Sequence, residues 1–264
     1  MNWDPTLNQI YELLDHNRYT KAIKLIENQL AKQPENQLYL SLKAVALARS
    51  SSGNPAEASS ICDKLINAKT PIMNENILRH LGLALKDLTQ WDKAVTLYER
   101  SFNHLNVPDP RIGEMLFLSL VRCEQFNKQQ IVAQKLNKAY PQERKYLFWA
   151  IVSMVSGYRS QNNDLMVTVA SKQLSKTLDS YRQNPAKVTT EEFGEIVRYH
   201  VTLLMSNKDY NGAIQQVLLE DEPFGKTLEP FDRKSLLAEC WHKSGGENVS
   251  LSNALYIQLL ENEK

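Results

Sequence analysis

The sequence predicts an all-α protein in which about six antiparallel helix pairs stack into a solenoid. Three observations carry this prediction: a short motif recurs every 35 or 36 residues, apolar residues follow a helical period between the motifs, and glycine is scarce. The 264 residues include 9 glycines, whereas average usage would give roughly 18. Because turn-rich all-β folds need many residues with positive φ, a chain so poor in glycine is expected to be mostly helical.

The recurring motif is an aromatic residue or proline followed, three positions later, by alanine in most copies. The last residues of successive copies are 36, 36 and 35 residues apart. The four copies are Tyr19-Thr-Lys-Ala22, Pro55-Ala-Glu-Ala58, Trp91-Asp-Lys-Ala94 and Phe126-Asn-Lys-Gln129. Each unit ends near a proline that cannot continue a helix, namely Pro34, Pro71, Pro108 or Pro141. A period of this length indicates an array of one repeated supersecondary unit.

Each repeat contains two stretches of about 14 residues with apolar positions at i, i+3, i+4 and i+7, which predict two antiparallel helices. The first helix is expected to start with Asp4 as N-cap and Pro5 at the first helical position. The alanine of the motif, such as Ala22, is expected where the two helices cross most closely, because a branched side chain there would overpack the contact. Gly82 is expected to play this part on the first helix of the third repeat.

The regular spacing loosens after Arg144. An apolar helix is expected over Tyr146–Val155, a polar loop over Tyr158–Asp164 and a long helix over Leu165–Arg182. This pair of helices would be larger than the pairs before it.

Two further helix pairs follow towards the C-terminus. Thr189 and Glu192 form a capping-box signal, and Tyr210-Asn-Gly-Ala213 restores the repeat motif. A last pair runs from about Phe231 and is interrupted by Gly245-Gly246. We therefore expect four regular repeats in residues 1–142 and two to three irregular, longer helix pairs in residues 143–264. Together they would form one solenoid, which is expected to be incomplete at its C-terminal end because no polar capping helix follows.

The period, the segment Leu78-x2-Leu81-Gly82-x2-Leu85, the motif and the closing proline resemble the tetratricopeptide repeat (TPR). This resemblance implies a helical scaffold for protein binding. The repeat register places one apolar side chain per unit on the inner, concave groove, namely Tyr11, Leu47, Leu83 and Leu118. An exposed apolar stripe of this kind marks a partner-binding surface. The alternative is that the chain's own neighbouring parts cover these side chains.

Four segments carry a closer resemblance, to the N-terminal part of the auxiliary subunit of N-terminal acetyltransferase B (NatB). They are Ile10–Ile23, Leu42–Leu47, Tyr146–Met154 with its Tyr-Leu-Phe-Trp stretch, and Arg198–Leu203. The resemblance implies a noncatalytic, cytoplasmic protein that binds the separate catalytic subunit of NatB. It also implies that the chain helps to anchor that subunit at the ribosome, where NatB acetylates nascent chains starting with Met-Asp, Met-Glu, Met-Asn or Met-Gln.

The net charge of +1 hides a gradient along the chain. Residues 1–110 are neutral, residues 111–188 carry a net +7 and residues 189–264 a net −6. Basic residues in the middle segment are candidate contacts to ribosomal RNA, namely Lys128, Lys135, Lys138, Arg144 and Lys145. Contacts of this kind weaken with added salt. The alternative is that these charges belong to ordinary solvated helix faces.

Two other functions compete with the NatB hypothesis. The chain could be a stand-alone TPR adaptor for another cytosolic complex. It could also be an acetyltransferase itself, because Arg79–Ala84 fits the segment with which acetyltransferases hold the pyrophosphate of acetyl-CoA. That chemistry needs free backbone amides at a helix start, whereas this segment is expected in the middle of a helix.

No cofactor, metal or small-molecule substrate is expected. No His-Glu-x2-His pattern or closely spaced Cys/His cluster occurs, and no apolar run approaches the roughly 18 residues of a membrane span. The three cysteines, Cys62, Cys123 and Cys240, are widely spaced within helical patterns. We expect them to be reduced core residues of a cytosolic protein.

Overall fold

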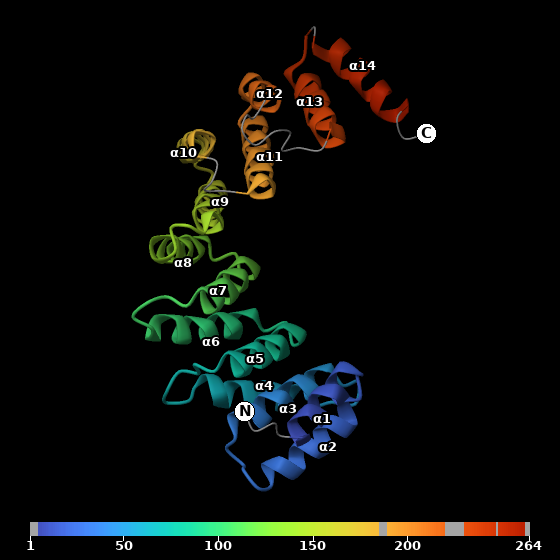
Figure 1. Ribbon diagram of the computed structural model, residues 1–264, viewed down its shortest axis with the longest axis vertical. Coiled ribbons are helices and arrows are strands. Elements are labelled where there is room, and N and C mark those ends of the chain that lie inside the picture. Colours follow the sequence, from blue (N-terminus) through green and yellow to red (C-terminus); the bar gives the residue numbers. More distant parts are fainter. Residues whose placement is uncertain (1–4, 185–188, 220–229, 247, 262–264) are drawn as a thin grey trace. The chain divides into compact units, whose positions relative to one another are not determined.

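The computed structural model describes residues 5–184, 189–219, 230–246 and 248–261, and every regular element in these ranges is a helix (Figure 1). The described helices are α1 (Pro5–Asp15), α2 (Tyr19–Leu30), α3 (Gln37–Arg49), α4 (Pro55–Ile66), α5 (Glu75–Asp87), α6 (Trp91–His104), α7 (Pro110–Arg122), α8 (Phe126–Ala139), α9 (Arg144–Ser160), α10 (Asp164–Gln183), α11 (Thr190–Ser206), α12 (Tyr210–Leu218), α13 (Pro230–Ser244) and α14 (Asn248–Glu261). The all-α fold class is confirmed. The described helices make seven pairs, because the irregular part contributes three. The N-cap expected at Asp4 lies outside the described residues.

The chain folds as two compact units, Met1–Ala139 and Tyr140–Lys264. The first contains α1–α8 and the second contains α9–α14. Within the first unit, helices pack in chain order, and α3 also packs on α5, so that one pair stacks on the next. The division into residues 1–142 and 143–264, and the continuity of one solenoid across it, stay predictions.

The repeat motif occupies the same structural position in each of its four copies. Its final residues, Ala22, Ala58, Ala94 and Gln129, are all buried. Gln129 replaces alanine without leaving its amide unpaired, since Nε2 donates to the carbonyl oxygen of Leu120 at 3.0 Å. The four closing prolines lie between helices, as predicted.

The small residue at Gly82 of α5 is explained by a close approach of α6. A Cβ added to Gly82 would lie 1.7 Å from the hydroxyl oxygen of Tyr98. That hydroxyl is buried and donates to the carbonyl oxygen of Leu78 at 3.3 Å. The predicted close helix crossing is therefore present, and the group that approaches Gly82 is the hydroxyl end of the Tyr98 side chain.

Side chains that accept backbone amide protons define half of the eight helix starts in the first unit. Asn36, Asn54, Asn74 and Asp109 each accept hydrogen bonds from two amides at the start of α3, α4, α5 and α7. The tight turns inside the pairs instead use residues in the left-handed conformation. Among the residues that the structure describes, five non-glycine residues adopt it, three of them in the first unit, including Thr89 with a φ of 57° between α5 and α6. The chain can therefore build these turns with few glycines.

The second unit contains longer helices, as the sequence indicated, with one correction. The polar loop expected over Tyr158–Asp164 is wrong for its first part, because α9 continues to Ser160. Tyr158 packs against the core of the unit, and this burial keeps its segment helical. The capping box is confirmed: Thr189 Oγ1 accepts from the Glu192 amide at 3.2 Å, and the Glu192 carboxylate accepts from the Thr189 amide at 3.1 Å.

The three cysteines are unpaired thiols. Cys62 and Cys240 are core residues, as expected, whereas Cys123 is only half-buried at the end of α7. The expectation of a core position is therefore wrong for Cys123. Cys123 is the C-cap of α7 and comes just before the left-handed residue Glu124, so it lies at the start of a turn and not on the buried face of a helix.

Candidate partner-binding site

Two of the four predicted groove residues line one pocket in the first unit. Tyr11 of α1 and Leu83 of α5 meet there, with apolar walls from Leu42 and Val45 of α3, and the pocket has a volume of about 400 Å³. Leu47 lies in the core at 5% exposure, while Leu118 of α7 is an exposed apolar side chain at 58%. The four positions thus differ widely in accessibility, and their role as one apolar groove stays a prediction.

His80 of α5 is the central polar group of this pocket, and sequence analysis did not single it out. Ser41 of α3 donates its only hydroxyl proton to the Leu38 carbonyl oxygen at 2.8 Å, so its oxygen must accept from His80 Nδ1 at 3.1 Å. The other nitrogen, Nε2, then accepts from the Tyr11 hydroxyl at 3.4 Å. Both nitrogens of the ring are therefore engaged by neighbouring side chains.

The protonation states of His80 and Tyr11 agree with this hydrogen-bond assignment. Burial, with a smaller contribution from the charge of Arg79, lowers the pKa of His80 to about 4, so the ring is neutral near pH 7. Burial also raises the pKa of the Tyr11 hydroxyl, which keeps its proton available for donation. A neutral histidine held by two hydrogen bonds positions Tyr11, and it is poorly suited to act as a base.

Charged side chains surround the apolar part of the pocket. Arg49 pairs with Asp87 at 2.7 Å, and Arg79 has a long 3.9 Å contact to Glu75 and stays largely exposed. Asp15 and Asn76 complete the polar lining. An apolar wall with two arginines beside it suits a side chain that combines an apolar body with a polar or acidic end.

The five predicted basic residues fall into two groups. Lys128 and Lys135 lie on α8, where the first pairs with Glu99 at 3.2 Å and the second lies over the ring of Phe102. Lys138 on the same helix is exposed and lines a second pocket, of about 470 Å³, together with Lys135. Arg144 and Lys145 belong to α9 of the other unit, where they lie over the rings of Tyr181 and Tyr146. Their role in binding RNA stays a prediction.

The segment Arg79–Ala84, which fits an acetyl-CoA-binding pattern, lies inside α5. In a helix interior the backbone amides are already used by the helix itself, so they cannot hold a pyrophosphate. The described part of the chain holds no group of three or more His, Cys, Asp or Glu side chains that could hold a metal ion. None of its helices combines the length and the apolar character of a membrane span.

Residues 4–256 match a family described as the Psidin N-terminal TPR repeats region. The chain belongs to this family. The TPR resemblance is thereby confirmed over nearly the whole sequence, including the irregular second half in which the motif is hardest to see.

Curated relatives connect the family to NatB. The chain is 27% identical, over 78% of its length, to the Arabidopsis thaliana NatB complex auxiliary subunit NAA25. It is 28% identical, over 56%, to the Caenorhabditis elegans NatB complex subunit NAA25 homolog, and 31% identical, over 56%, to the phagocyte signaling-impaired protein of Drosophila pseudoobscura pseudoobscura. The resemblance to the NatB auxiliary subunit is confirmed. The chain spans 19%, 15% and 15% of these relatives, respectively.

A solved structure of Naa15/Naa10 bound to HypK-THB contains a chain of the same fold. Their TM-score is 0.54 at 17% sequence identity, and the match covers 97% of this chain and 36% of the other. At this identity the likeness shows the fold alone.

Proposed function

We propose that this chain is a noncatalytic scaffold of NatB that binds the catalytic acetyltransferase subunit. The observation that carries the proposal is the match to a NatB auxiliary subunit over 78% of the chain. The interior position of Arg79–Ala84 in α5 supports a noncatalytic role, because it leaves no free amides for acetyl-CoA. In this proposal the protein works in the cytoplasm without a cofactor, a membrane contact or a small-molecule substrate of its own.

The catalytic subunit would contact the pocket of Tyr11 and Leu83 and the exposed Leu118. These residues lie on α1, α5 and α7, the first helices of the first, third and fourth pairs, at positions where the repeat register predicts a groove. A few well-packed residues near the centre of an interface carry most of its binding energy, and an unpaired charge buried among them is costly. Leu83→Glu should therefore weaken binding strongly.

Isothermal titration of the purified chain with the purified catalytic subunit tests this proposal. We expect saturable binding that Leu83→Glu weakens by about 2 kcal/mol or more. Leu165→Glu, the same change at an exposed leucine of α10, serves as the matched control and should leave binding intact. If the wild-type chain does not bind the catalytic subunit, the protein is an adaptor for another complex. If Leu83→Glu binds normally, the groove assignment is wrong.

We also propose that the basic residues of α8 and α9 help to anchor the complex at the ribosome, where chains starting with Met-Asp, Met-Glu, Met-Asn or Met-Gln are acetylated. Lys128, Lys135 and Lys138 are exposed residues of one helix, α8. Reversal of these three charges to glutamate should reduce cosedimentation with ribosomes, and added salt should have the same effect on the wild-type chain. Unchanged cosedimentation of the variant would contradict this part of the proposal.

A further inference from the structure

The second pocket of the first unit, which we call the α8 pocket, combines two basic side chains with an apolar wall. It lies between the end of α6, the connection from α6 to α7, and α8, and its volume is about 470 Å³. This volume is within the range of small-molecule sites, about 300–1,000 Å³. The residues that line it are Phe102 and Asn103 of α6, Leu105, Asn106, Val107 and Pro108 of the connection, and Lys135, Lys138 and Ala139 of α8.

The two lysines give the α8 pocket a surplus of positive charge. In the described part of the chain no acidic side chain lines it. The acidic residues on either side of the segment 102–108 are already engaged, since Glu99 pairs with Lys128 at 3.2 Å and Asp109 caps the start of α7. The pocket therefore suits a ligand that carries negative charge.

Lys135 is held in place by two neighbours within the pocket. Its Nζ donates to Asn103 Oδ1 at 3.3 Å and lies 5.7 Å from the ring centre of the buried Phe102. An ammonium group has three protons, so the bond to Asn103 leaves two for a ligand. Lys138 is exposed and follows three positions later, which makes it a neighbour of Lys135 on the surface of α8. The two lysines are therefore placed to bind a phosphate together.

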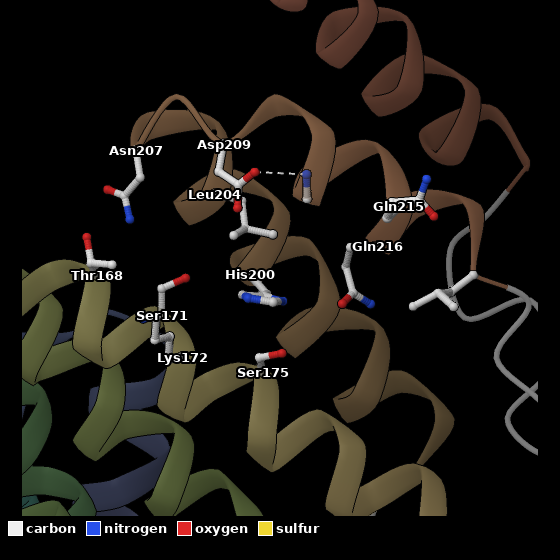
Figure 2. A pocket seen from close by; sticks show the side chains of 12 residues that line it. Thr168, Ser171, Lys172, Ser175, His200, Leu204, Asn207, Asp209, Gln215 and Gln216 are labelled. Atoms are coloured by element: carbon white, nitrogen blue, oxygen red, sulfur yellow. Dashed lines mark hydrogen bonds between the residues drawn. The ribbon is translucent and has the colours of Figure 1, made fainter.

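A pocket of the second unit has a different charge balance. It lies among α10, α11 and α12, has a volume of about 390 Å³ and is lined mostly by polar, uncharged side chains such as Ser171 and His200 (Figure 2). Among its described lining residues the one basic side chain, Lys172, is matched by one acidic side chain, Asp209. The surplus of positive charge therefore distinguishes the α8 pocket from this one.

The apolar wall of the α8 pocket favours an unpaired nucleotide over duplex RNA. Val107 is 67% exposed, and Leu105 is half-buried. A duplex presents phosphates, riboses and base edges, so it offers no flat apolar surface to cover Val107. An unpaired nucleotide can turn its base out of the stack and lay the face of the base on this wall. The amide group of the exposed Asn106 can exchange hydrogen bonds with the edge of the base.

We propose that the α8 pocket binds one unpaired nucleotide of an RNA strand. The base packs on Val107 and Leu105, and its edge bonds to Asn106. Lys135 and Lys138 donate to its phosphate. This inference rests on the proposed ribosome anchor for its choice of RNA, and it specifies the ligand of that anchor as single-stranded.

Fluorescence anisotropy of the full chain with two labelled RNA probes tests the proposal. The probes are a single strand of twelve uridines and a duplex of twelve base pairs, measured at the same salt concentration. The duplex has the higher charge density, so lysines that act through charge alone would bind the duplex more tightly. A pocket for an unpaired nucleotide should instead bind the single strand about fivefold more tightly or better.

Two variants separate the base contact from the charge. Val107→Ser removes the apolar wall at an exposed position, so it should weaken binding of the single strand about fivefold and leave binding of the duplex unchanged. Lys138→Gln should weaken binding of both probes and lower the slope of log affinity against log salt by about 1. Ile131→Ser changes an exposed apolar residue of α8 outside the pocket. It is the matched control for Val107→Ser and should bind the single strand normally.

A labelled peptide of twelve glutamates tests the competing class of ligand, an acidic polypeptide, and should bind more weakly than the single strand. The proposal is overturned if this peptide or the duplex binds as tightly as the single strand, or if Val107→Ser keeps full affinity for the single strand. Failure here and failure of the ribosome anchor are distinguishable. Reduced cosedimentation of the triple lysine variant without a preference for the single strand leaves the anchor and removes the nucleotide site. A preference for the single strand with unchanged cosedimentation removes the anchor and leaves the nucleotide site.

Discussion

Gly82→Ala should destabilise the first unit, although alanine normally favours a helix. The added Cβ would lie 1.7 Å from the Tyr98 hydroxyl oxygen and 2.9 Å from Cζ of the same ring. Tyr98 is buried in α6, and burial raises its pKa to about 12, so the hydroxyl stays protonated and bonded to the Leu78 carbonyl. The ring end must therefore move, and it must give up that hydrogen bond.

The expected magnitude is the balance of three contributions. Replacement of glycine by alanine in a helix interior gains about 1 kcal/mol. Overpacking costs about 1–3 kcal/mol, and the lost hydrogen bond costs about 1 kcal/mol. The net loss of unfolding free energy should therefore be about 1–3 kcal/mol. In a Tyr98→Phe background the hydroxyl collision is absent, so Gly82→Ala should cost about 1 kcal/mol less there.

Urea unfolding followed by circular dichroism measures this four-variant cycle. Hydrogen exchange of peptides from α5 and α6 reports whether the loss is local to the first unit. The reasoning is refuted if Gly82→Ala is stabilising, or if it costs the same with and without the Tyr98 hydroxyl.

Three further predictions concern strain, protonation and reactivity. Thr89 holds a φ of 57°, so Thr89→Gly should stabilise the chain by about 1 kcal/mol in urea unfolding, and a loss of stability would show that the turn is unstrained. Burial lowers the pKa of His80 to about 4 from 6.5. Between pH 6.5 and pH 4 the unfolded chain therefore binds a proton at this histidine that the folded chain does not. The contribution of His80 to the free energy of unfolding is fully present above pH 6.5 and falls by about 2–3 kcal/mol towards pH 4. His80→Leu should flatten that part of the pH profile. Iodoacetamide followed by mass spectrometry should label the half-buried Cys123 first, because Cys62 and Cys240 are buried. Burial and the neighbouring Asp92 also raise the pKa of the Cys123 thiol, while burial raises the pKa values of Cys62 and Cys240 to about 12 and about 11. Equal labelling of all three cysteines would contradict the core positions of Cys62 and Cys240.

The local features of the fold could be predicted from the sequence because each has a short-range signal. The recurring alanines, the closing prolines and the capping box at Thr189 depend on neighbouring residues and helical period alone. The end of α9 depends instead on Tyr158, which packs on a core built from helices far along the chain. A polar local sequence could not reveal that burial.

The candidate sites were harder to predict for the same reason. The repeat register places Leu47 on the expected first helix, but α3 contacts α2, α4 and α5, and these neighbours bury the side chain. Tyr11 and His80 meet across 69 residues of sequence. His200 lies on a helix face between apolar residues, so the sequence gives no sign that it lines a pocket with side chains of α10 and α12.

The central claim is that this chain is a noncatalytic partner of the NatB catalytic subunit. The most direct measurement is acetyl transfer to peptides that start with Met-Asp, Met-Glu, Met-Asn or Met-Gln, with a Ser-starting peptide as control. We expect no activity from the purified chain alone, and a higher rate for the catalytic subunit on the four Met-starting peptides when the chain is added. Acetylation by the chain alone, or an unchanged rate of the catalytic subunit in its presence, would contradict the claim.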